Sequence, residues 1–195
     1  MELDFSKNNG LLPVIVQHWQ TGQVLMLGYM NSEALVKTIA EDRVTFFSRS
    51  KNRLWTKGEE SGNFLQVKKM FPDCDNDTLL ILAEPAGPAC HRGTTACFDN
   101  DQDIPFLFRL EAIIDDRYKN PVESSYVNKL HEKGLNKIAQ KVGEEATETV
   151  IAALAQTRED LLDESSDLMF HLLVLLREKG VSLGELSEHL RKRHR

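Results

Sequence analysis

The spacing of apolar residues changes near Leu110, and this change divides the chain into two kinds of structure. Before it, short runs rich in β-branched and aromatic residues alternate with glycine and proline, a pattern typical of strands and turns. After it, apolar residues recur at helical spacing. The sequence therefore predicts an α+β protein with a β-rich, metal-binding domain over residues 1–112 and an all-helical domain over residues 113–195.

Individual elements follow from local signals. Two apolar runs flank Thr21-Gly22 and predict a β-hairpin, and the segments VTFFSRS, NFLQVKKM and TLLILAE predict further strands. Asn31 is expected to cap a short helix that extends to Asp42. In the second half we expect a linker near the polar run 115–121 and helices over Tyr126–Gln156, Leu161–Lys179 and Leu183–Arg193.

The three cysteines of the chain lie close to a group of acids. Cys74 lies within the run DCDND, and Cys90 and Cys97 lie within GPACHRGTTACF. Thiolates suit zinc, so the three cysteines are candidate zinc ligands. Carboxylates suit magnesium, so Asp73, Asp75 and Asp77 are candidate magnesium ligands. If DCDND is extended, the three aspartates share one side and the thiol takes the other; the alternative is an ordinary acidic turn.

Three thiol ligands would leave the fourth zinc position to water, as in catalytic zinc sites. His91 follows Cys90 directly and is either a fourth ligand, a base beside that water or a histidine bonded to its own loop. We favour the base, because a zinc ion with four protein ligands has no position left for water.

The helical half carries two acidic pairs at i, i+3 spacing, which places each pair on one side of its helix. The second of these helices is apolar on nearly every side, as buried helices are, and burying acids there requires a compensating cation. Solvated surface acids are the alternative. We expect His171 to be packed against its neighbours, and magnesium to be bound by Glu145, Glu148, Glu164 and Asp167.

A basic stretch between the expected strands offers a site for phosphate. Cationic side chains alternate there with hydroxyls and glycines, and an indole ring is available for stacking on a base. Composition alone fits a charged surface equally well. The candidate substrate-binding residues are Arg49, Lys51, Arg53, Trp55 and Lys57.

The formal net charge of −6 argues against a generally basic nucleic-acid-binding domain, and the 41% of hydrophobic residues is enough for a packed core. We see neither a secretory leader nor an apolar run long enough to span a bilayer. An odd number of cysteines fits a reducing compartment. The sequence thus predicts a soluble, cytoplasmic protein without membrane or nucleic-acid partners.

The motifs together resemble a known family. VLMLGYMN, FFSRSKNRLWTKGEESGN, DCDND and GPACHRGTTACF lie in the first half, and SYVNKLHEKGLNKIAQKVGEEATE and DESSDLMFHLLVLL lie in the second. In this order they are similar to the bifunctional enzymes of histidine biosynthesis that join phosphoribosyl-AMP cyclohydrolase to phosphoribosyl-ATP pyrophosphatase. Arg92 and Ala96 stand where threonine and serine are frequent in that loop, which affects loop hydrogen bonds rather than ligands.

The resemblance implies nucleotide substrates and two hydrolytic steps. Phosphoribosyl-ATP would lose pyrophosphate, and zinc-activated water would then open the adenine ring of phosphoribosyl-AMP at N1–C6. It also implies a homodimer whose zinc site takes Cys74 from one subunit and Cys90 and Cys97 from the other, with magnesium on the two acidic sets.

Two other functions are compatible with the thiols. A zinc nucleobase deaminase would require His-x-Glu and Pro-Cys-x-x-Cys, and neither is present. A zinc-stabilised dimeric binding protein would hold zinc without catalytic turnover.

Overall fold

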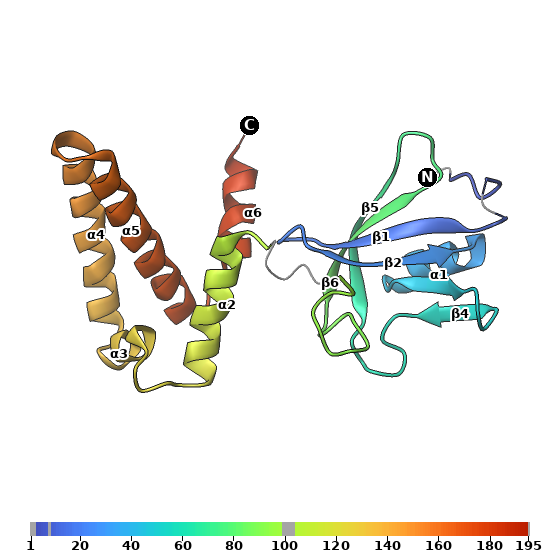
Figure 1. Ribbon diagram of the computed structural model, residues 1–195, viewed down its shortest axis with the longest axis horizontal. Coiled ribbons are helices and arrows are strands. Elements are labelled where there is room, and N and C mark those ends of the chain that lie inside the picture. The colour runs from blue at the N-terminus through green and yellow to red at the C-terminus, as the bar shows by residue number, and fades with distance from the viewer. Residues whose placement is uncertain (1–2, 8, 99–103, 195) are drawn as a thin grey trace. The chain divides into compact units, whose positions relative to one another are not determined.

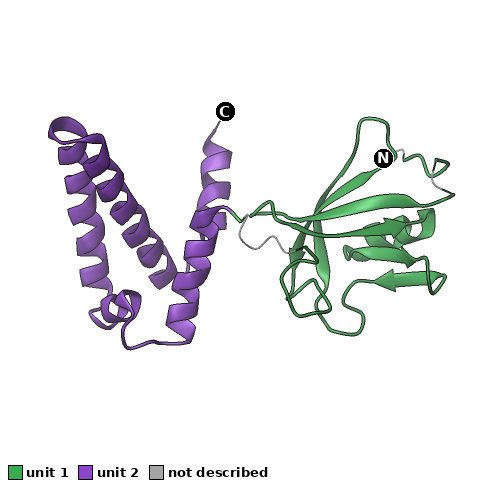
Figure 2. Ribbon diagram, viewed as in Figure 1, with its two compact units in different colours: residues 1–104 green, residues 105–195 purple. Residues whose placement is uncertain are grey.

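The protein is described by a computed structural model covering residues 3–7, 9–98 and 104–194. The chain forms two compact units, Met1–Ile104 and Pro105–Arg195 (Figure 2). The first unit contains all six strands of the described residues and the second contains helices only (Figure 1), which confirms the α+β class.

The units divide before the position that the sequence indicated. The helix α2 (Phe106–Lys119) runs through both the expected boundary after residue 112 and most of the expected linker. Asp115 in that polar run pairs with Arg177 of the second unit, Oδ1 to Nε, at 2.5 Å. The run is therefore polar because it forms ion pairs within the second unit, and not because it connects the units.

The first unit is built on a four-stranded sheet. Its strands are β1 (Leu12–His18), β2 (Val24–Met30), β5 (Leu65–Pro72) and β6 (Leu79–Pro85), in the order β2-β1-β6-β5. β1 runs antiparallel to β2 and parallel to β6, and β5 runs antiparallel to β6. The predicted hairpin is confirmed. Alternate side chains of β1 are fully buried, namely Leu12, Val14 and Val16.

A helix and a second hairpin complete this unit. The Asn31 side chain accepts from Ala34 N at 2.8 Å and caps α1 (Ser32–Glu41), as predicted. β3 (Thr45–Ser48) pairs with β4 (Arg53–Thr56), which the sequence did not predict as a strand. Phe46 of β3 packs so closely on Gly28 that a Cβ there would lie 2.4 Å from its ring. Glycine at this position therefore permits β3 to approach the large sheet.

The second unit has four further helices: α3 (Tyr126–Glu132), α4 (Leu135–Ala155), α5 (Arg158–Glu178) and α6 (Leu183–Arg193). The single helix predicted over 126–156 was wrong, because Gly134 takes a φ of +80° and breaks it. α5 begins three residues earlier than predicted, since Thr157 and Asp160 form a capping box. The core gathers around Ile114, Leu130, Ile138 and Val174.

α5 is less buried than its composition predicted. Within one chain only His171, Leu173 and Val174 of this fully described helix are buried, and Leu162 is 48% exposed. The reason is that its packing partners in one chain, chiefly α4 and α2, cover only part of its circumference. No described helix is both long enough and apolar enough to cross a membrane.

Candidate active sites

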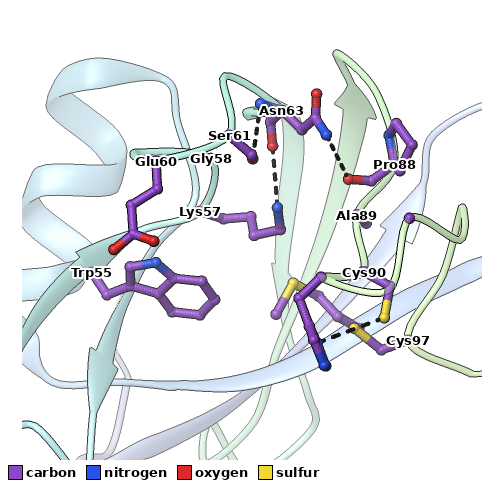
Figure 3. Close-up of a pocket in the computed structure, with 13 residues that line it drawn as sticks. Trp55, Lys57, Gly58, Glu60, Ser61, Asn63, Pro88, Ala89, Cys90 and Cys97 are labelled. Carbon is purple, nitrogen blue, oxygen red and sulfur yellow. Dashed lines mark hydrogen bonds between the residues drawn. The ribbon is translucent and has the colours of Figure 1, made fainter.

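Two of the three thiols lie in a pocket of the first unit. Cys90 and Cys97 line a cavity of about 330 Å³ together with Trp55, Lys57 and His91 (Figure 3). The loop that carries the thiols is held by backbone hydrogen bonds, with Cys90 N donating to Thr94 O at 3.1 Å and Cys97 N donating to Leu25 O of β2 at 2.7 Å. The first bond closes the loop on itself, and the second fixes Cys97 to the sheet.

The two thiols have different electrostatic surroundings. Hydrogen bonds from Arg92 N, which lies 3.5 Å from Cys90 Sγ, and from Thr94 lower the pKa of Cys90. Desolvation, followed by the nearby Cys90, raises the pKa of Cys97. His91 Nδ1 lies 3.9 Å from Cys90 Sγ. Cys90 is therefore the thiol that ionises first, with an imidazole next to it.

Cys74 is exposed in the loop between β5 and β6. Within the described residues, three or more metal-binding side chains come within 4.8 Å of one another at two places, and both are made of carboxylates. One protomer thus brings Cys90 and Cys97 into one pocket but does not join Cys74 to them.

The acids around Cys74 form one of these clusters. Of the two conformations that the sequence left open for DCDND, the structure has the turn, in which Asp73 Oδ1 accepts from Asp77 N at 3.0 Å and Thr78 N at 3.1 Å. Asn76 supports this turn with a φ of +60°. The turn, rather than strand alternation, brings one carboxylate oxygen each of Asp73, Asp75 and Asp77 within 4.8 Å of one another.

The basic stretch contributes to a second cavity. This cavity, of about 280 Å³, is lined by Ser48, Lys51, Arg53, Trp55 and Glu60. Trp55 and Glu60 also line the thiol cavity, so one indole is shared by both. The sequence interpretation did not select Glu60.

The remaining predicted basic residues lie elsewhere. Arg49 stacks on Tyr29 with its guanidinium carbon 3.9 Å from the ring centre. Lys57 is only 7% exposed, lies in the thiol cavity and donates to Asn63 O at 3.3 Å (Figure 3). Desolvation lowers the pKa of Lys57, and Cys97 and Cys90 act against that shift. Lys57 therefore shares the cavity of the thiols with its ammonium bonded to Asn63, whereas Lys51 and Arg53 line the second cavity.

The second carboxylate cluster lies on α4. Glu144, Glu145 and Glu148 have oxygens within 4.8 Å of one another, although the sequence interpretation omitted Glu144. Desolvation first, and then the charges of Glu164 and Glu145, raise the pKa of Glu148, which shows that α5 contributes an acid here. Of the four predicted acidic ligands, Glu145 is buried at 3% exposure, whereas Glu148 and Asp167 are exposed.

His171 is packed beside this cluster, as the sequence predicted. Its Nε2 lies 3.1 Å from Tyr126 Oη and its Nδ1 lies 2.9 Å from Asp167 O. The same Nδ1 is 3.7 Å from Glu145 Oε1. The imidazole therefore connects α3, α4 and α5 behind the acids.

Comparison with known proteins gives a family match for each unit. Residues 26–99 match the family model of phosphoribosyl-AMP cyclohydrolase, and residues 107–194 match that of phosphoribosyl-ATP pyrophosphohydrolase. The chain is 57% identical over 194 residues to the histidine biosynthesis bifunctional protein HisIE of Escherichia coli K12, covering 99% of this chain and 96% of the relative. The proteins of the same name from Bacteroides thetaiotaomicron and Salmonella typhimurium are 56% and 55% identical, covering 100% and 99% of this chain and 97% and 96% of those relatives.

Proposed function

Because the chain belongs to the family of bifunctional histidine-biosynthesis hydrolases, we propose that each unit carries one of the two reactions. The protein hydrolyses phosphoribosyl-ATP to phosphoribosyl-AMP and pyrophosphate, and then opens the adenine ring of that product. We assign pyrophosphate release to the helical unit and ring opening to the β-rich unit. The family matches, which fall on either side of the boundary between the units, support this assignment.

One observation carries the assignment of the ring-opening site: Trp55 lines both the thiol cavity and the basic cavity. The adenine of phosphoribosyl-AMP stacks on this indole with C6 toward Cys90 and Cys97. A phosphate of the substrate then lies in the neighbouring cavity, where Lys51 and Arg53 supply cationic donors. The two cavities thus match the two chemical halves of one nucleotide.

Ring opening adds water at C6 and breaks the N1–C6 bond. His91 accepts a proton from the attacking water and returns one to the departing N1, so the proton balance closes within the pocket. Its Nδ1 is directed at the Cys90 sulfur, which leaves Nε2 for this transfer. Lys57 fixes the pocket wall through Asn63 and keeps a positive charge beside the sulfurs.

The thiol donors fit zinc when two subunits are combined. Cys90 and Cys97 share one pocket, and their exposed companion would be Cys74 of the partner subunit. Zinc held there would lower the pKa of a water molecule to about 7. The separation of the thiols within one protomer supports a site shared between the two subunits of a homodimer. The odd number of cysteines also supports the cytoplasm as its compartment.

The acidic donors fit magnesium. Three oxygen-bearing side chains converge in the β5–β6 turn, and we assign Asp73, Asp75 and Asp77 to one ion. In the helical unit the acids already crowd one another, as the raised pKa of Glu148 indicates. We assign Glu145, Glu148, Glu164 and Asp167 to that site, where magnesium would neutralise the leaving pyrophosphate.

Mixing two inactive variants tests the shared zinc site. Cys74→Ser and Cys90→Ser should each abolish ring opening of phosphoribosyl-AMP in a folded homodimer. When the two variants are unfolded and refolded together, mixed dimers regain one complete thiol set and activity returns. Refolding each variant alone is the control. Absence of any recovery in verified mixed dimers would contradict a site shared between subunits.

A further inference from the structure

A lysine lies within the acidic cluster of the helical unit. Lys141 Nζ is 2.7 Å from Glu145 Oε1 and 2.8 Å from Glu144 Oε1. The Lys141 side chain is 20% exposed, and that of Glu145 is only 4% exposed. One ammonium thus links two of the three carboxylates that converge on α4.

This contact has a physical cause. A carboxylate as buried as that of Glu145 requires a counter-charge, and Lys141 supplies it from one helical turn away. A divalent ion bound to the Glu145 carboxylate would supply that charge itself. Two cations cannot share this carboxylate closely, because their mutual repulsion is strong where water is partly excluded. Binding of the ion therefore requires that the ammonium leave.

We propose that Lys141 is a built-in counter-ion that exchanges with magnesium and then turns to the phosphate oxygens of the substrate. The inference rests on the magnesium site proposed above. A lysine ammonium is a compact charge on a flexible four-carbon stem, so it can move without any rearrangement of α4. Magnesium commonly holds substrate phosphates directly, which places polyphosphate oxygens beside the displaced ammonium. Lys141 is thus a positioning residue in both states.

Two other lysines provide comparisons. Lys137 lies one turn earlier on α4 and bonds to Gln140 Oε1 at 3.3 Å, so it is a matched control. Lys7 joins Asp75 at 2.7 Å and Asp77 at 3.1 Å, but its side chain is 42% exposed. Such solvated pairs contribute little energy, and we infer no exchange there.

Magnesium titration of the full-length protein by calorimetry tests the exchange. Glu148→Gln serves to identify the heat of the helical site. Lys141→Met should bind magnesium about tenfold more tightly, which corresponds to about 1.4 kcal/mol. Lys141→Arg and Lys137→Met should stay within about twofold of wild type, since the first keeps a cation and the second leaves the contact intact. In saturating magnesium, Lys141→Met should raise the KM for phosphoribosyl-ATP about tenfold, as expected for one lost charge-assisted contact.

A second measurement does not depend on the folding of a variant. In wild-type protein with carbon-labelled lysines, the NMR signal of Lys141 should shift when magnesium is added. This signal is assigned by its absence from the spectrum of Lys141→Arg. Equal or weaker magnesium affinity in folded Lys141→Met, or an unchanged Lys141 signal, would overturn the exchange while leaving the metal site standing. Identical titrations of wild type and Glu148→Gln would overturn both the site and the exchange.

Discussion

Replacing Glu148 with glutamine should abolish the stabilisation of the helical unit by magnesium and raise its stability without metal at neutral pH. Glu148 has an oxygen within 4.8 Å of oxygens of Glu144 and Glu145, and Glu164 faces it from α5. Like charges at this distance oppose folding until a cation neutralises them. Glutamine removes one charge and one ligand together.

The size of the effect follows from mass action. Magnesium at one hundred times its Kd adds about 2.7 kcal/mol to a fold that binds it. For a domain of roughly 60–100 residues this is a rise in Tm of roughly 10–20 °C. The wild-type helical unit should show such a rise, and the Glu148→Gln unit should show almost none.

The pH dependence has a defined sign. Desolvation and neighbouring acids raise the pKa of Glu148 above its ordinary value of 4.5, so the folded unit holds this proton more tightly than the unfolded chain does. Without metal, the contribution of Glu148 to the free energy of unfolding is therefore fully present below pH 4.5 and is lost as the pH rises through the raised pKa. Glu148→Gln should be free of this loss.

Thermal unfolding of the full-length protein, followed by far-UV circular dichroism, measures both effects with and without magnesium. Glu123→Gln, an exposed acid in the loop between α2 and α3, is the matched control. Equal stabilisation of Glu148→Gln and wild type by magnesium would rule out Glu148 as a ligand. A variant less stable than wild type at neutral pH without metal would rule out repulsion among these acids.

Two further substitutions test the pocket and the helical core. Trp55→Ala should raise the KM for phosphoribosyl-AMP roughly 5- to 150-fold, because base stacking contributes about 1–3 kcal/mol. Trp19 lies outside the lining of the two described cavities, so Trp19→Ala should change this KM little. Equal effects of the two substitutions in steady-state kinetics would contradict the stacking role of Trp55. Ile138→Ala should lower the free energy of unfolding by about 2–5 kcal/mol, since this side chain is fully buried. Val150→Ala, at 58% exposure, should cost about 0.5 kcal/mol or less, and similar losses in urea unfolding would contradict the assigned core.

The sequence predicted those elements whose signals are local. The hairpin through Gly22 and the helix α6, whose first turn carries the Ser182–Glu185 capping box, were both found where expected. The break at Gly134 was missed, because the apolar spacing continues across it. The boundary predicted after residue 112 lies inside α2, and the polar run at Asp115 forms an ion pair with Arg177, a residue distant in sequence that no local signal indicates.

The candidate sites show the same division. The i, i+3 spacing identified Glu145 and Glu148 but could not show that Glu144 also reaches their oxygens. A basic motif predicted Lys57 as a phosphate contact but could not show that folding buries its side chain in the cavity of the thiols. Which side chains a pocket encloses depends on how separate strands and loops pack, and residue order alone does not specify that packing.

The assignment of one reaction to each unit is tested by a paired assay on the full-length protein with phosphoribosyl-ATP and with supplied phosphoribosyl-AMP. Glu148→Gln should lose pyrophosphate release and keep ring opening, and Cys90→Ser should keep pyrophosphate release and lose ring opening. Loss of both reactions in either folded variant, or ring opening retained by Cys90→Ser, would contradict two separate sites with these residues at their centres.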